Sequence, residues 1–202
     1  MLWKENERLS AAQSSISKVI NTKQDLKQYL LEDSKALFFS EKVSWWTKVK
    51  DPIWKFEKCL RYCEYYKNSL PNHPLISYPL YLFHKFRFRK LSIKLGFSIP
   101  ENVFGMGLSI AHYGSIVINP NVRVGNYCRI HVGVNIGANK YGDDVPEIGN
   151  NVYIGPGAKI FGKIYIGDNT KIGANAVVNK SCEGNCTLVG VPAKEVPTQE
   201  DH

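Results

Sequence analysis

The chain has 202 residues, a net charge of +8 and 44% hydrophobic residues, so it is long enough for one large or two modest hydrophobic cores. No stretch approaches the roughly 18 apolar residues that cross a bilayer, and the charged first ten residues lack the apolar segment of a secretory signal. The sequence therefore predicts a cytoplasmic protein. Its five cysteines are expected to stay reduced, and none has the CxxC spacing of a zinc site.

Helical patterns occupy the first hundred residues. The polar segment 1–21 predicts a helix with a frayed start. A clearer helix is expected over 22–39, because Thr22 and Asp25 have the spacing of a capping box and apolar residues follow at helical intervals.

Two more helices are expected before the pattern changes. Asp51 followed by Pro52 indicates a helix start, and this helix should reach about residue 68. Pro71 and Pro74 indicate a break. The last helix is then expected over 78–95, ended by Gly96.

Positive charge is concentrated in this half of the chain. Residues 1–100 carry 18 Lys and Arg against 9 acids, whereas residues 101–202 carry 8 against 9. The densest group is Lys85, Arg87, Arg89, Lys90 and Lys94. It is either a solvated helix face or a contact for an acidic surface such as anionic lipid headgroups, an acidic glycan or ligand phosphates; nucleic acid is disfavoured because no recognition motif accompanies it. The nearby Phe83, Phe86 and Phe88 are expected in the core or in a subunit contact.

From Phe104 to Val178 the sequence repeats every six residues. An aliphatic residue, usually followed by Gly, falls at Ile118, Val124, Ile130, Ile136, Ile148, Ile154, Ile160, Ile166, Ile172 and Val178. A unit this short buries its apolar residue only by stacking on its neighbours. The repeat therefore predicts a parallel β-helix, and the whole chain an α+β protein: a helical N-terminal region (1–97), a β-helix of hexapeptide repeats (98–196) and a short tail (197–202).

Two interruptions of the repeat are candidate functional segments. His112 lies where the register slips between Ile110 and Ile118, and His131 follows an inward position about one coil later. A histidine is a suitable general base for a hydroxyl, although each could equally be structural. Two histidines are too few for a three-histidine zinc site, so no metal is expected.

The second interruption, 137–147, lacks the inward aliphatic residue and predicts a loop outside the coil. Its acids Asp143, Asp144 and Glu147 are candidates for binding an acceptor hydroxyl or orienting a histidine. A solvated acidic loop is the alternative.

Four segments resemble the serine acetyltransferase branch of the hexapeptide acyltransferases: 112–117 (HYGSIV), 154–162 (IGPGAKIFG), 172–178 (IGANAVV) and 190–194 (GVPAK). The resemblance implies a left-handed β-helix, a homotrimer, and acetyl-CoA as the acetyl donor, bound between subunits. It implies His112 as the catalytic base. It also implies a cofactor site that contains Gly157, Ala158, Gly190, Val191, Pro192, Ala193 and Lys194.

The sequence departs from this branch where the family binds serine. The two aspartates that accompany the family's histidine are replaced by Ala111 and Phe97, and its Arg-His pair before a proline by Asp144 and Val145. An acid in place of a cation should repel a carboxylate.

We therefore expect an acetyl-CoA-dependent O-acetyltransferase with catalytic residues His112 and His131 and a carbohydrate acceptor, such as a surface polysaccharide or its precursor. The basic helix would hold such an enzyme at the inner face of the membrane. The alternatives are a serine acetyltransferase in which Arg123, Arg129 or a neighbouring subunit binds the carboxylate, an N-acetyltransferase of an amino sugar, and a non-catalytic scaffold.

Overall fold

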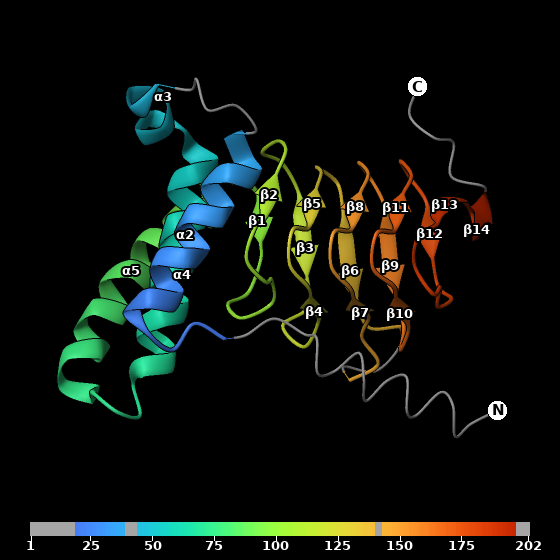
Figure 1. Ribbon diagram of the computed structural model, residues 1–202. Coiled ribbons are helices and arrows are strands. Elements are labelled where there is room, and N and C mark those ends of the chain that lie inside the picture. The colour runs from blue at the N-terminus through green and yellow to red at the C-terminus, as the bar shows by residue number, and fades with distance from the viewer. Residues whose placement is uncertain (1–18, 39–43, 140–142, 197–202) are drawn as a thin grey trace.

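The computed structural model describes residues 19–38, 44–139 and 143–196. Helices gather at one end of a solenoid of short strands, and the last strands lie at the opposite end (Figure 1). We call the helical part the cap. It contains α2 (Lys23–Phe38), α3 (Trp45–Lys50), α4 (Pro52–Ser69) and α5 (Pro74–Leu95). Of the helix expected over 1–21, residues 1–18 lie outside the described residues, and 19–21 are not helical.

The first residues of α2 and α4 form the capping hydrogen bonds that the sequence predicts. The Thr22 and Asp25 side chains exchange hydrogen bonds with each other's backbone: Thr22 N donates to Asp25 Oδ2 at 2.9 Å, and Asp25 N donates to Thr22 Oγ1 at 3.0 Å. Asp51 Oδ1 accepts from Trp54 N at 2.7 Å, with Pro52 as the first helical residue.

The last helix was predicted wrongly at its start and correctly at its end. It begins at Pro74, because a proline without an N–H fits the first helical turn, and it continues through Pro79. Gly96 ends it in the left-handed conformation with φ 79°. The short helix α3 was not predicted, since six residues are too few to show a helical period.

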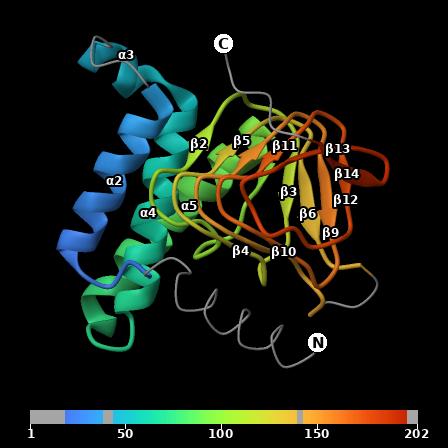
Figure 2. The same ribbon diagram turned by 45° about the vertical axis from the view of Figure 1, so that its right-hand side comes forward.

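The strands form three faces of a triangular coil, all paired in parallel except for a final antiparallel hairpin (Figure 2). The first face contains β1 (Phe97–Ser98), β3 (Ile116–Ile118), β6 (Asn135–Gly137), β9 (Lys159–Phe161) and β12 (Val177–Val178). The second contains β4 (Arg123–Val124), β7 (Glu147–Ile148) and β10 (Tyr165–Ile166). The third contains β2 (Ser109–Ile110), β5 (Arg129–Ile130), β8 (Tyr153–Ile154), β11 (Lys171–Ile172), β13 (Thr187–Gly190) and β14 (Ala193–Val196).

All ten aliphatic residues of the repeat are buried in the middle of this coil, as predicted. The parallel pairs keep identical positions in line from coil to coil; for example, Ile110, Ile130, Ile154 and Ile172 pair in succession. The repeat therefore fixes which residues lie above one another along each corner of the triangle.

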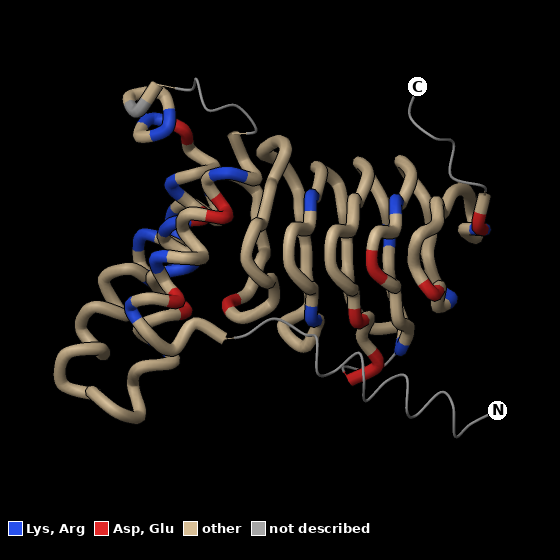
Figure 3. The backbone as a smooth tube through the Cα atoms, in the orientation of Figure 1, with Lys and Arg blue, Asp and Glu red and all other residues tan. Residues whose placement is uncertain are grey.

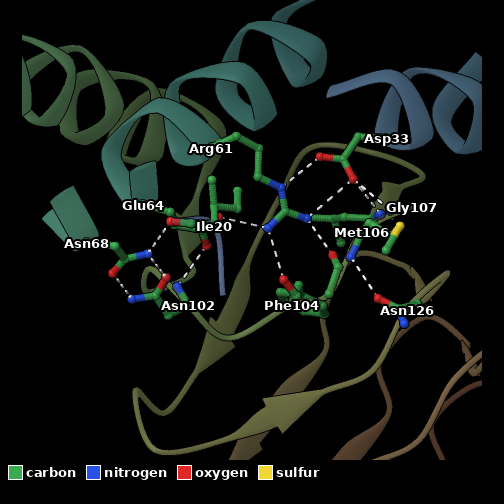
Figure 4. A network of polar contacts seen from close by, with 12 residues as sticks. Ile20, Asp33, Arg61, Glu64, Asn68, Asn102, Phe104, Met106, Gly107 and Asn126 are labelled. Carbon is green, nitrogen blue, oxygen red and sulfur yellow. Dashed lines mark hydrogen bonds and ion pairs between the residues drawn. The ribbon is translucent and has the colours of Figure 1, made fainter. Parts of the chain in front are cut away.

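Arg61 joins the cap to the first coil (Figure 4). Its side chain is fully buried, and it forms ion pairs with Asp33 of α2 (Nε to Oδ2, 2.7 Å) and Glu64 of α4 (Nη1 to Oε2, 2.9 Å). It also donates to the carbonyl oxygens of Phe104 at 2.9 Å and Gly105 at 2.6 Å.

The two carboxylates extend this contact. Asp33 Oδ1 accepts from the backbone N–H groups of Gly107 (2.8 Å) and Leu108 (3.0 Å), and Glu64 Oε1 accepts from that of Asn102 (2.7 Å). A neighbouring acid, Glu57, is also fully buried, and burial raises its pKa well above the usual range, with the charge of Asp33 adding to the effect. The cluster thus holds one guanidinium and its carboxylates against the loop 104–108.

We expect Arg61→Met to lower the free energy of unfolding by about 3–5 kcal/mol, because it leaves buried carboxylates without their counter-charge. The matched control is Lys35→Met, which breaks the exposed ion pair between Lys35 and Glu32 and should cost less than about 1 kcal/mol. Urea denaturation measures both values. Equal losses for the two variants would contradict this role for Arg61.

Candidate active site

One corner of the triangle carries the histidines. It consists of the segments that lead from the third face to the first: 111–115, 131–134, 155–158 and 173–176. We call this corner the histidine edge. The hairpin of β13 and β14 continues the third face beyond β11. The edge therefore runs from the segment that follows β2, the strand of this face nearest the cap, toward the hairpin at the far end of the solenoid (Figure 1).

The structure brings His112 and His131 together. Their ring centroids lie 6.1 Å apart, with an angle of 62° between the ring planes. The centroid of the His131 ring lies 5.1 Å from that of the Tyr153 ring. The contacts arise because neighbouring coils are separated by about 4.8 Å and the residues hold adjacent positions on successive coils. His112 is exposed, whereas His131 is half-buried. Tyr153 was not predicted as a site residue from the sequence. Its repeat position is the same as that of Arg129, two residues before His131, and this shared position is the signal that could have indicated it.

The surroundings of His131 favour its neutral form. Burial lowers its pKa, and the charges of Arg129 and His112 lower it further. Its Nε2 atom is buried and has no hydrogen-bond partner among the described residues. A neutral imidazole next to an exposed one is a suitable place to accept and pass a proton.

The two arginines named as carboxylate ligands lie on different faces. Arg123 lies on β4 of the second face and donates to the carbonyl oxygens of Pro120 (3.0 Å) and Val122 (2.8 Å). Arg129 lies on β5, two residues before His131, and its Nη1 donates to Ser109 Oγ at 2.8 Å. Of these two cations, Arg129 is the one beside the histidines.

The expected cofactor residues occupy the same edge and its far end. Gly157 lies on the edge with φ +75°, and a Cβ atom there would collide with Asn175 Oδ1. The neighbouring Ala158 is buried in the coil, so its side chain cannot line a ligand and only its backbone can. Residues 190–194 run from the end of β13, through the hairpin turn, to the start of β14, and Gly190 pairs with Ala193. In the turn, Val191 is exposed and the Val191–Pro192 peptide bond is cis.

The acidic loop lies at another corner. Asp143 and Asp144 are exposed in the segment between β6 and β7, which leads from the first face to the second, and Asp143 Oδ1 accepts from Asn121 Nδ2 at 3.4 Å. Glu147 begins β7 beside Arg123 in the strand register. Within one chain, these acids are therefore not brought to the histidines.

No three His, Cys, Asp or Glu side chains of the described residues are grouped so that they could hold a metal ion. In the same part of the chain, none of the helices is both long and apolar enough to traverse a bilayer.

Comparison with known protein families supports the hexapeptide repeat that the sequence indicates. Residues 146–180 match the model of the bacterial transferase hexapeptide (six repeats). A serine acetyltransferase of Helicobacter pylori is 38% identical over 136 residues, which are 61% of this chain and 80% of the relative. The chain belongs to the serine acetyltransferase-like hexapeptide-repeat acyltransferases. Its fold, a helical region followed by a left-handed β-helix, is as predicted.

Other relatives match smaller or larger shares of the chain. A serine acetyltransferase of Synechococcus elongatus is 40% identical over 99 residues, and the match spans 48% of this chain but only 41% of that longer relative. Among solved structures, the serine acetyltransferase of Brucella abortus in complex with coenzyme A has a TM-score of 0.66 at 27% identity, covering 86% of this chain and 68% of that one.

We expect the pKa of His131 to rise in His112→Gln and in Arg129→Met, because each change removes a positive charge that disfavours protonation of His131. It should remain below its usual value in both variants, since burial is the larger cause. Titration of the histidine ring protons by NMR measures the shift, with Lys180→Met as a distant control. The same titration midpoint in all four proteins would show that His131 does not sense these neighbours.

Proposed function

We propose that this acyltransferase-family chain is an acetyl-CoA-dependent O-acetyltransferase whose reaction takes place at the histidine edge. The observation that carries the proposal is that His112 and His131 lie together at one end of the edge that also contains Gly157 and Ala158, two residues that resemble the family's acetyl-CoA site in sequence. The Brucella abortus relative with bound coenzyme A supports the choice of donor.

In the proposed reaction, His112 accepts the proton of the acceptor hydroxyl as its oxygen attacks the acetyl carbonyl carbon. The C–S bond then breaks, and the coenzyme A sulfur leaves and takes up the proton. His112 suits this role because its ring is exposed to a substrate. The lowered pKa of His131 beside it disfavours a second positive charge next to the protonated base.

Serine is the acceptor that the relatives favour over a carbohydrate, since the proteins compared are named serine acetyltransferases. Arg129, a cation beside the histidines, would bind the serine carboxylate instead of the family's Arg-His pair, which this chain lacks. This placement supports the serine alternative more strongly than the sequence alone did.

A carbohydrate hydroxyl remains the second candidate because of Asp143 and Asp144. Both are exposed on the loop where the family has a cation for the serine carboxylate. We propose a homotrimer in which this loop of one subunit reaches the histidine edge of the next. In that arrangement two carboxylates would face the acceptor, which suits an uncharged polyol better than an amino acid.

The deciding experiment compares L-serine with a panel of mono- and oligosaccharides by measuring thiol release from acetyl-CoA. We expect turnover with serine, and the KM for serine should rise at least about tenfold in Arg129→Met, because a charged hydrogen bond is lost. Arg123→Met is the matched control and should leave KM unchanged. Turnover with a sugar alone would replace serine by the second candidate, and turnover with neither would refute both.

Replacement of His112 by Ala should lower kcat by about 10²–10⁴, the usual contribution of a general base. Binding of acetyl-CoA, measured by calorimetry, should be retained, because the donor lies along the later segments of the edge. Unchanged turnover would remove His112 from the base role. Loss of both turnover and donor binding would instead indicate a structural role for His112.

A further inference from the structure

Helix α5 has an apolar face that nothing in the described structure covers. Its inner face packs on the cap through Phe88, which stacks on Phe56 with ring centroids 5.2 Å apart, and through the buried Ser77 and Leu95. Other large apolar side chains of the same helix are exposed: Leu75 (91%), Ile76 (68%), Leu82 (48%), Phe83 (55%), Phe86 (72%) and Ile93 (75%).

These side chains form a continuous stripe. With about 3.6 residues per turn, Leu75, Leu82, Phe86 and Ile93 share one line along the helix, opposite to Phe88. Phe83 and Phe86 therefore lie outside the core of the single chain, and of the two predicted places for them only a subunit contact is left. A stripe of this length on a monomer marks a contact surface.

Cations border the stripe on both sides. Arg89 lies on one side, and Lys90 and Lys94 lie on the other, and all three are exposed. Helix α5 contains no acidic residue, and the structure records no ion pair between these three cations and any described residue. By contrast, Lys85 bonds to Glu101, and Arg87 lies over the Phe83 ring at 5.5 Å. Figure 3 shows the positive residues gathered on the cap.

We propose that this outer face of α5, the apolar stripe with Arg89, Lys90 and Lys94, docks on an anionic membrane surface. Apolar side chains on one side of a helix enter the boundary between lipid headgroups and acyl chains, and the flanking cations meet the anionic headgroups. The surface needs no other part of the chain to move, because α5 is already fixed to the cap by its inner face.

The charges argue against the same face of a second copy as the occupant. A two-fold contact places the same patch on both partners, so each subunit would bring the same three cations and no acid of α5 into the contact. Like charges held together in this way oppose association. An anionic lipid surface offers the opposite sign over the whole stripe.

The proposal is independent of the reaction and of the acceptor. The cap stands at the end of the solenoid remote from the β13–β14 hairpin, so docking through α5 leaves that hairpin away from the membrane (Figures 1 and 2).

The test is sedimentation of the full chain with vesicles of phosphatidylcholine, with and without about a third of phosphatidylglycerol. We expect binding to the anionic vesicles only, weakening as salt rises. The double variants Leu82→Ser/Phe86→Ser and Arg89→Glu/Lys90→Glu should each lower the partition coefficient at least about tenfold. The matched control Lys163→Glu/Lys180→Glu makes the same charge change on exposed solenoid residues and should bind like the wild type.

Circular dichroism and light scattering on each variant separate loss of binding from loss of folding or assembly. Absence of wild-type binding, or equal loss in the control variant, would overturn the proposal. If the α5 variants change the oligomeric state while the wild type ignores anionic vesicles, the outer face is an interface between copies and the lipid proposal fails.

Discussion

The contact between Arg61 and the first coil determines how the two parts of the protein fit together. A fully buried guanidinium is tolerated only where carboxylates and carbonyl groups surround it, and here they come from α2, α4 and the loop 104–108. These partners are far apart in the sequence. The ion cluster is satisfied in one arrangement of cap and solenoid, so it specifies that arrangement as well as stabilising it.

The cap in turn closes one end of the solenoid. A stack of coils leaves its terminal coils with one uncovered side, where apolar residues and strand groups would meet water. Phe56 of α4 packs against Phe97 of β1 with ring centroids 4.9 Å apart, which extends the solenoid core into the cap. His112, the proposed base, therefore belongs to the coil that the cap contacts.

Much of this structure follows from local rules in the sequence. The repeat identifies the inward residues because each aliphatic position has only one buried direction, and the capping residues locate the starts of α2 and α4 because each replaces a missing backbone partner. The outer face of α5 was not predictable in this way, since its apolar residues recur at the same helical period whether they face the core or solvent. The buried cluster of Arg61 was equally hidden, because nothing in the spacing of Asp33, Arg61 and Phe104 brings them together.

The candidate site also has two parts, the histidine edge and the acidic loop, which lie at different corners of the coil. His112, His131 and Gly157 share one corner because each follows a strand of the third face in successive coils, and this half of the site resembles the family's donor and base in sequence. Asp143 and Asp144 lie in the loop between β6 and β7, at a different corner, and in the proposed trimer they reach the acceptor only across a subunit contact. A change in this loop can alter the acceptor while the coil, its core and the histidine pair stay as they are. The choice of acceptor is thus free to vary on a scaffold whose donor chemistry is constrained by packing.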